Sequence, residues 1–351
     1  MSLSSVSSLA FDTPAYAYEP VALSAPAVAP APSVTTLSTV HGEAVVRLKP
    51  KYGQAAVEVT VRYFWHGAVG VPTVIVQGGI SATRKVCTVG DAAGWWDDLV
   101  GSGAAVDLQR CRVLSIDWLA AADLGGVCAV SSEDQADALA ALLDVLGIAR
   151  VQAFVGSSYG AMVGLAFAAR HALRLGRLVA ISGAHRAHPL ATALRAIQRE
   201  IVRGGIDRGD VDSALALARQ LAMTTYRGAD EFAERFDAAP EFRDGRFHFP
   251  VEDYLGAAGR KFVARFDAQR YLSLSESIDL HRIDAADVAV SCDLVAVSSD
   301  RLVPSADLRA LADELGPAAR YHEIDSRYGH DAFLKETGRV SALVADALSC
   351  C

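Results

Sequence analysis

Residues 151–160, VQAFVGSSYG, decide the fold of this chain, and the alanine-rich stretch AMVGLAFAARHALRLG follows directly at 161–176. The first stretch is apolar like a buried strand, and the second has the apolar spacing of a helix. Between them, Gly156-Ser157-Ser158-Tyr159-Gly160 fits the pattern G-x-S-x-G. In this context a tight strand-to-helix turn exposes the serine hydroxyl above a sheet edge, and the glycines permit the strained backbone. We therefore predict that Ser158 is a nucleophile; the alternative is a plain glycine turn.

Short apolar runs alternate with helical stretches on both sides of this turn. The runs that predict buried strands are TVIVQGG (73–79), CRVLSIDWL (111–119), RLVAISGA (177–184) and SCDLVAVSSD (291–300). The helical stretches are SSEDQADALAALLDVLGI (131–148), RLVPSADLRALADELG (301–316) and RVSALVADAL (339–348). Two earlier segments, 41–49 and 55–67, alternate apolar and polar residues as an antiparallel hairpin does. The pattern predicts an α/β fold with a mostly parallel sheet and helices on both faces.

Four segments follow from this pattern. Residues 1–40 are rich in Ser, Ala and Pro, which predicts a flexible tail. Residues 41–184 form the first part of the α/β core, and residues 283–351 form the second part. Residues 185–282 have helical periodicity and no convincing buried strand, so we predict a helical lid inserted between the two core parts.

The composition of the 351-residue chain excludes several classes of protein. Its 52% hydrophobic content argues against disorder. No stretch approaches the ~18 consecutive apolar residues of a membrane span. The net charge of −8 predicts no nucleic-acid partner. The six cysteines include no C-x-x-C pair, so we predict no metal site, and we interpret Cys350 and Cys351 as terminal thiols. A signal peptide begins with a positively charged segment, but no Lys or Arg precedes Arg47. We therefore expect a cytoplasmic protein.

A nucleophilic serine needs a base, and the base needs an acid that orients it. Asp300 ends a buried run, and His330 follows later in the chain, before the last helix. This order after Ser158 is the usual one for a nucleophile on such a turn, so we predict a Ser-His-Asp triad. The alternatives are a turn or cap role for Asp300 and a surface position for His330. His185 and His188 are the nearest competitors for the base, and they could instead line the entrance.

The tetrahedral intermediate of this chemistry needs two backbone N–H donors. One should be Tyr159, which follows the nucleophile. The other should come from the turn Gly78-Gly79-Ile80 after TVIVQ, with Gly79 and Ile80 as the best candidates. The alternative is that the glycine pair only permits a tight turn, which would not exclude the role.

Further motifs extend the pattern along the chain. They are GWWDDLVGSGAAVD (94–107), AIQREIV (196–202), TTYRG (224–228), VEDYLGAAGRKFVARFDAQRYLSLSESID (251–279) and GHDAFL (329–334). These motifs have the same order and register as in the homoserine O-acyltransferase family, which the chain resembles from about residue 75 to 340. The resemblance implies the α/β-hydrolase fold, a helical lid, often a homodimer through that lid, and no bound cofactor. It also implies acyl transfer from acyl-CoA, a co-substrate, to the hydroxyl of an amino acid such as homoserine.

The resemblance also assigns roles to single residues. Ser158 becomes the nucleophile, Asp300 the orienting acid and His330 the base. Arg227 becomes the arginine that holds the amino acid carboxylate, and Asp331 becomes the acid that receives the amino group. A guanidinium binds a carboxylate with two hydrogen bonds, and an aspartate suits an ammonium group. The alternatives are a solvent-facing charge for Arg227 and a helix N-cap for Asp331.

The chain departs from the family pattern in places. Tyr159 stands where many members carry methionine, Ala161 replaces a second glycine, and the stretch after VLSIDWL is much shorter than the family's glycine-rich run. These departures leave the acyl donor open. A succinyl carboxylate needs a cation if it is buried, and Arg84, with Lys85 beside it, is a candidate; the alternative is a solvated basic pair. We favour succinyl-CoA slightly over acetyl-CoA.

The expected mechanism is ping-pong, with Ser158 carrying the acyl group and the lid excluding water. Two other activities stay open. An L-serine O-acyltransferase of the same family is one, because a single methylene is worth only ~1–3 kcal/mol of discrimination. A carboxylesterase is the other, because it would use the same triad with water as the acceptor.

Overall fold

The computed structural model of the chain describes residues 36–350. Most of the tail expected at 1–40 therefore lies outside the described residues, as does Cys351. The end of that segment corrects the expected boundary, because strand β1 spans Leu37–Leu48 and pairs with β2, Val57–Ala68, along its whole length. The pairing starts with Leu37 opposite Ala68, so backbone hydrogen bonds order the chain before His41. The predicted antiparallel hairpin is confirmed.

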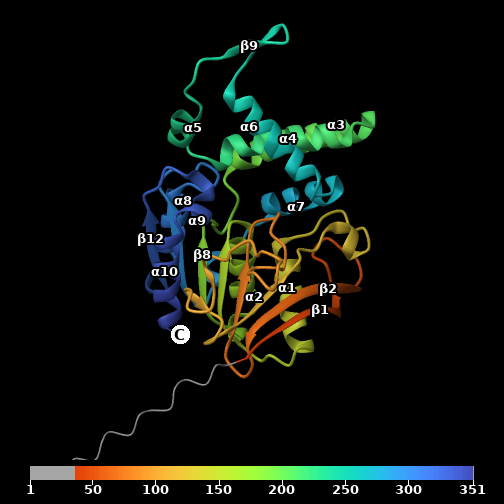
Figure 1. The fold of residues 1–351 in the computed structure, drawn as a ribbon. Helices are drawn as coiled ribbons and strands as arrows, with labels where there is room; N and C mark the ends of the chain where they lie inside the picture. The colour runs from red at the N-terminus through yellow and green to blue at the C-terminus, as the bar shows by residue number, and fades with distance from the viewer. Residues whose placement is uncertain (1–35, 351) are drawn as a thin grey trace, which may run out of the picture. The chain divides into compact units, whose positions relative to one another are not determined.

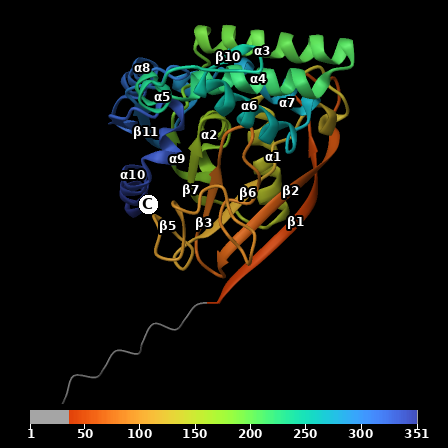
Figure 2. The same ribbon diagram turned by 45° about the horizontal axis from the view of Figure 1, so that its top comes forward.

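The core is an eight-stranded sheet in the order β1-β2-β6-β3-β7-β8-β11-β12 (Figure 2). The pairs β1–β2 and β2–β6 are antiparallel, and every other pair is parallel. The remaining strands are β3 (Thr73–Gln77), β6 (Arg112–Ile116), β7 (Val151–Ser157), β8 (Leu175–Ile181), β11 (Ser291–Val297) and β12 (Ala319–Ile324). This arrangement confirms the mostly parallel sheet that the sequence predicts.

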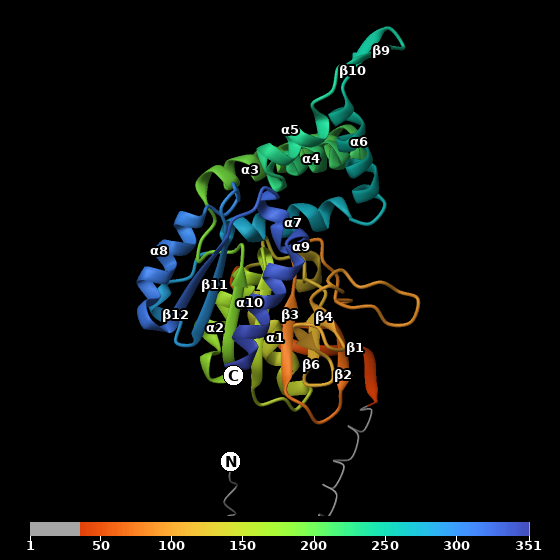
Figure 3. The ribbon, with the colours of Figure 1, turned by 60° about the vertical axis from the view of Figure 1, so that its left-hand side comes forward.

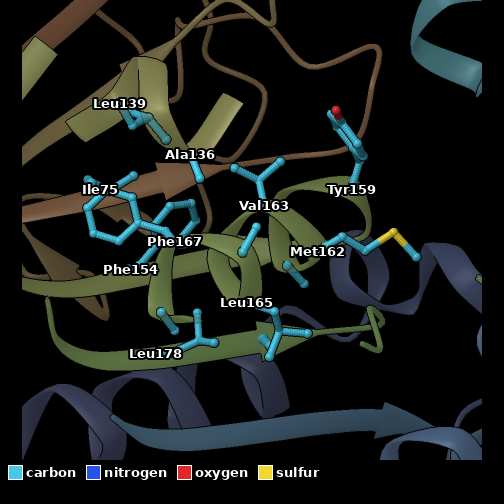
Figure 4. Packing of buried hydrophobic residues seen from close by; sticks show 14 of the residues in the cluster. Ile75, Ala136, Leu139, Phe154, Tyr159, Met162, Val163, Leu165, Phe167 and Leu178 are labelled. Carbon is cyan, nitrogen blue, oxygen red and sulfur yellow. The ribbon is translucent and has the colours of Figure 1, made fainter. Parts of the chain in front are cut away.

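Helices cover both faces of the sheet. On one face α1 (Ser132–Val145), α2 (Tyr159–Arg170) and α8 (Ser305–Leu315) pack on alternate strand residues. Figure 4 shows part of that layer, where the strand residues Ile75 and Phe154 belong to the same cluster as helix residue Val163. On the other face α10 (Thr337–Ser349) packs with the loop that contains Trp96. Successive residues of each buried strand point to opposite faces, so continuous apolar runs serve both layers.

Between β8 and β11 the chain forms a separate helical layer, drawn in green and teal in Figure 1. Its helices are α3 (Pro189–Arg208), α4 (Val211–Tyr226), α5 (Ala229–Phe236), α6 (Pro250–Val263) and α7 (Ala268–Leu280). Its two ends are joined, because the Ile283 N–H donates to the His185 carbonyl at 2.8 Å. The sequence analysis did not predict the exposed hairpin of β9 (Glu241–Arg243) and β10 (Arg246–His248), which projects from this layer in Figure 3.

Short elements complete the fold. They are the strands β4 (Val100–Gly101) and β5 (Val106–Asp107), the helix α9 (Ala332–Lys335), and 3-10 turns at Ala121–Leu124, Ala172–Arg174, Ala285–Asp287, Gly316–Ala318 and Gly329–Asp331. Among residues 36–350, no helix combines the length and the apolar character needed to cross a membrane.

The junction of β7 and α2 gives a test of the packing. An alanine Cβ at Gly156 would lie 2.3 Å from the Gly160 carbonyl oxygen, so Gly156→Ala must displace backbone. We expect it to lower the free energy of unfolding in urea by at least ~2 kcal/mol. The control is Gly338→Ala in α10, where a Cβ meets nothing within 4 Å. This control should leave stability unchanged or raise it by about 0.5 kcal/mol. Equal losses in both variants would contradict the close packing at Gly156.

Candidate active site

Ser158 sits on a strained turn between β7 and α2. Its φ and ψ are 54° and −120°, a conformation that L-residues rarely adopt, and its N–H donates to the Ile181 carbonyl at 2.8 Å. The turn is tight because backbone packs on backbone: a Cβ on Gly160 would lie 2.3 Å from the Gln77 carbonyl oxygen. This backbone packing therefore holds Ser158 in its strained conformation, with the side chain above the carboxyl edge of the parallel strands.

The structure brings the three predicted triad residues into one hydrogen-bonded chain. Ser158 Oγ lies 2.8 Å from Nε2 of His330, and Nδ1 of His330 lies 2.7 Å from Oδ2 of Asp300. The other Asp300 oxygen accepts the N–H groups of Leu302 and Val303 at 2.9 and 3.0 Å. With both its oxygens engaged, Asp300 can hold the imidazole in the tautomer whose Nε2 accepts a proton from the serine.

His330 is buried in the protein, and its surroundings shift its pKa. Burial acts most strongly and disfavours the charged ring, but the Asp300 charge and hydrogen bond, together with the Asp331 charge, raise the pKa above its usual value. The Tyr226 ring stacks on the imidazole at 5.9 Å and Phe333 meets it edge-on at 6.0 Å. The lid residue Tyr226 thus helps to cover the candidate base.

The turn after β3 lies against Ser158, as the predicted oxyanion site requires. A Cβ built on Gly79 would be 3.8 Å from Ser158 Oγ, and both Gly79 and Ile80 line the cavity that holds Ser158. Tyr159 begins α2, where the first backbone N–H groups have no partner within the helix. The three predicted backbone positions therefore border the same space.

Two neighbouring cavities share part of their lining at this site. The smaller, about 240 Å³, contains Ser158 and His330, and the larger, about 1020 Å³, opens beside it. Lining residues common to both are Ile80, Ser81, Ala82, Trp95 and Arg219. A ligand that spans both cavities would pass Arg219.

The wall of the larger cavity is basic. It includes Lys85, Arg219, Lys261 and Arg265, and no ion pair is found for these four among the described residues. The Arg219 guanidinium lies over the rings of Tyr226 and Phe262 at 5.1 and 4.8 Å. A concave wall with unpaired cations favours an anionic ligand.

Arg227 and Asp331 lie where the two cavities meet, as expected, but they contact each other. Arg227 Nε is 3.2 Å from Asp331 Oδ2 without the geometry of a hydrogen bond. Burial raises the pKa of Asp331, and the charge of Arg227 opposes that effect. Glu231 was missed from the sequence: it is a buried acid in the first turn of α5, 3.1 Å from Arg227 Nη1, and Arg227 itself lies between α4 and α5. Its position four residues after Arg227 was the available signal.

The structure also places the three other predicted residues, Arg84, His185 and His188. The Arg84 guanidinium pairs with Asp117 and lines neither cavity, so the structure does not bring it to Ser158 as the suggested acyl-carboxylate contact. Asp117 is close to Arg84 in space but distant in sequence, so the sequence did not show that this acid neutralises the Arg84 charge. His188 does line the Ser158 cavity, whereas His185 lies at the joined ends of the lid and lines neither cavity.

A second basic group that the sequence analysis missed faces Ser158. Arg195 of α3 lines the smaller cavity, and it shares the carboxylate of Asp279 with Arg199 at 2.6 Å each. Two guanidinium groups against one carboxylate leave a net positive charge. Within the described part of the chain, no group of three or more His, Cys, Asp or Glu is placed to hold a metal ion.

Comparison with known proteins agrees with this geometry. Residues 72–337 match the family model described as the alpha/beta hydrolase fold. The chain is 52% identical to a homoserine O-succinyltransferase of Xanthomonas campestris pv. campestris, over 88% of this chain and 84% of the relative. It is 33% identical to a serine O-succinyltransferase of Litchfieldella anticariensis, over 73% and 82%.

A solved structure shows the same fold. The homoserine O-acetyltransferase from Bacillus anthracis superposes with a TM-score of 0.80 at 17% identity, over 90% of this chain and 98% of that chain. Esterase E22 superposes with a TM-score of 0.78 at 16% identity, over 89% and 100%. At 17% and 16% sequence identity, these superpositions show a shared fold and nothing about activity.

The raised pKa of His330 predicts how the reactivity of Ser158 depends on pH. The imidazole accepts a proton only when neutral, so labelling of Ser158 by a serine-directed phosphonate should rise with pH, with a midpoint above 6.5. Asp300→Asn removes the charge that raises this pKa, so the midpoint should move down and the plateau rate should fall ~10³–10⁴-fold. A midpoint that is the same in both proteins would contradict the assignment of His330 as the base.

Proposed function

Because the chain belongs to the homoserine O-acyltransferases of the alpha/beta hydrolase fold, we propose that it transfers a succinyl group from succinyl-CoA to the hydroxyl of L-homoserine. Acetyl-CoA is the nearest competing donor. The observation that carries the proposal is the hydrogen-bonded chain of Ser158, His330 and Asp300 at the junction of a small cavity and a large basic one.

In the first half of the proposed reaction, Ser158 Oγ attacks the thioester carbonyl while His330 Nε2 takes the hydroxyl proton. The negative charge that develops on the carbonyl oxygen is stabilised by the Tyr159 N–H and the Gly79–Ile80 turn. The C–S bond then breaks, His330 returns the proton to the departing thiolate, and free coenzyme A leaves. The serine now carries the acyl group as an ester.

In the second half, the homoserine hydroxyl gives its proton to His330 and attacks the acyl carbon. The ester bond to Ser158 then breaks, and the serine recovers its proton. Arg227 would bind the carboxylate of homoserine and Asp331 its ammonium group, which places the hydroxyl near His330. The Arg227 Nε that has no hydrogen bond supports this role.

The larger cavity suits the nucleotide end of the donor. Coenzyme A carries its negative charge on phosphates far from the thioester, and Lys85, Lys261 and Arg265 offer unpaired cations on that side. The thioester arm would then pass Arg219 into the smaller cavity, toward Ser158. Together the two cavities fit an elongated donor whose reacting end is short and whose far end is anionic.

Arg195 supports the preference for a succinyl group. It lines the Ser158 cavity and lies close enough to His330 for its charge to lower the pKa of the base. The positive charge that Arg195 and Arg199 hold in excess over Asp279 would neutralise the free carboxylate of a succinyl group. An acetyl group has no such carboxylate and gains nothing from this cluster.

We also propose that the enzyme is a homodimer joined through the lid. Three exposed aromatic side chains at the lid hairpin support this: Phe242, Phe247 and Phe249 are 67%, 58% and 47% exposed. Clustered exposed aromatics are typical of protein interfaces. The cytoplasmic location stays a prediction from the sequence.

The first test is release of free thiol from succinyl-CoA and acetyl-CoA, each with and without L-homoserine. We expect release that depends on homoserine, is faster with succinyl-CoA, and is lost in Ser158→Ala. Thiol release with L-serine but not with homoserine would identify L-serine as the acceptor. Thiol release at the same rate with and without an amino acid would indicate a hydrolase. No release from either thioester would refute the acyltransferase.

The donor preference has a test of its own. Arg195→Met keeps the bulk of the side chain and removes its charge, while Asp279 keeps its bonds to Arg199 and Thr192. We expect kcat/KM for succinyl-CoA to fall ~10–100-fold, because a desolvated carboxylate loses a charged partner. The value for acetyl-CoA should change less than about threefold.

The matched control is Arg203→Met on the same helix, where the side chain is exposed and, among residues 36–350, forms an ion pair with Glu200 alone. It should leave both donors unaffected. Equal losses with both thioesters in Arg195→Met would show that Arg195 supports the fold of the site and does not select the donor.

A further inference from the structure

Trp118 follows β6 and reaches across to the turn beside Ser158. Its Nε1–H donates to the carbonyl oxygen of Gly79 at 3.0 Å, and the Ala82 N–H donates to the same oxygen at 2.9 Å. Trp118 is only 2% exposed, so water does not compete for this bond. No role in the proposed reaction has so far been given to this side chain.

The Gly79 carbonyl and the Ile80 N–H belong to one planar trans peptide, in which they point in opposite directions. A partner that fixes the direction of the carbonyl therefore also fixes the direction of the N–H. A peptide that follows two glycines turns easily, because neither glycine has a Cβ to restrict it. Two donors on one carbonyl also polarise the peptide and make its N–H a stronger donor.

We propose that Trp118 is a positioning residue for the oxyanion site, which acts through the Gly79–Ile80 peptide and is supported from the lid by the hydrogen bond between Tyr159 and Ser277. The proposal rests on the proposed function in one respect: the negative charge develops on an oxygen bonded to the carbon that Ser158 attacks. Trp118 itself touches no reacting atom.

Tyr159 connects the two oxyanion donors. Its backbone N–H is the second donor, and its ring meets the Trp118 indole edge-on, with the ring centres 4.9 Å apart. Its hydroxyl lies 2.6 Å from Ser277 Oγ on α7, and both residues are buried. The indole is thus held between the turn that it orients and the residue that supplies the other donor.

The lid contributes a second contact to this group. The Arg270 guanidinium of α7 donates to the backbone carbonyl of Trp118. Helix α7 therefore bonds to Trp118 directly and to Tyr159 through Ser277, and so supports both residues from the lid.

Trp118→Phe tests the proposal, because it keeps an aromatic ring and removes the N–H. We expect kcat to fall ~10–100-fold with little change in the KM of either substrate and no change in the pH midpoint. The affinity for an alkyl trifluoromethyl ketone, which forms an anionic tetrahedral adduct with a serine, should fall by a similar factor. The matched control is Trp65→Phe, since the buried Trp65 Nε1 has no hydrogen-bond partner within the described part of the chain.

Tyr159→Phe and Ser277→Ala test the link to the lid. Each should lower kcat and ketone affinity ~3–10-fold, and the double variant should be no worse than Tyr159→Phe, because that variant already removes the bond to Ser277. Thermal unfolding of each variant checks that the fold persists.

Three results would overturn the proposal: unchanged ketone affinity in Trp118→Phe, an equal loss in Trp65→Phe, or additive losses in the double variant. Ketone binding needs Ser158, His330 to accept its proton, and the oxyanion site, but no acyl-CoA. A wild-type protein without thiol release would therefore refute the acyltransferase and still leave the role of Trp118 measurable.

Discussion

The site depends on the backbone contact between the end of β7 and the first turn of α2. Gly156 approaches the Gly160 carbonyl, Gly160 approaches the Gln77 carbonyl, and no side chain fits at either position. The contact forces Ser158 into its strained conformation and lifts its hydroxyl above the sheet edge. Because parallel strands end at the same edge, the loops after β3, β6, β11 and β12 reach Ser158 there. These loops carry Gly79, Trp118, Asp300 and His330.

Much of the fold could be predicted from the sequence, because its signals are local. The apolar runs, the glycine turn and the order of Ser158, Asp300 and His330 are all visible along the chain. Pairings between distant residues are not. Arg84 is adjacent to the predicted turn, but Asp117 neutralises it, and the basic group at Arg195 depends on Asp279, which lies on another helix. The hairpin β9–β10 is exposed and short, so burial imposes no pattern on it.

The distribution of charge shows why net charge was a weak guide to ligands. The chain carries −8 overall, which argues against a polyanionic partner, yet the larger cavity has a wall of unpaired cations. The field inside a concave site depends on the few charges that line it, since solvent and salt screen the others. An acidic exterior and a basic cavity are therefore compatible, and they suit a small anionic substrate better than a nucleic acid.

The contact between Arg227 and Asp331 bears on the choice of acceptor. Both side chains are largely buried, so each would be costly to leave without a partner. In the proposed reaction, an amino acid zwitterion would enter between them, giving its carboxylate to Arg227 and its ammonium group to Asp331, so that no net charge is added to the site. A water molecule or a simple alcohol offers neither charge and would leave the pair closed. In the proposed reaction, the pair therefore favours an amino acid over a simple alcohol as the acceptor.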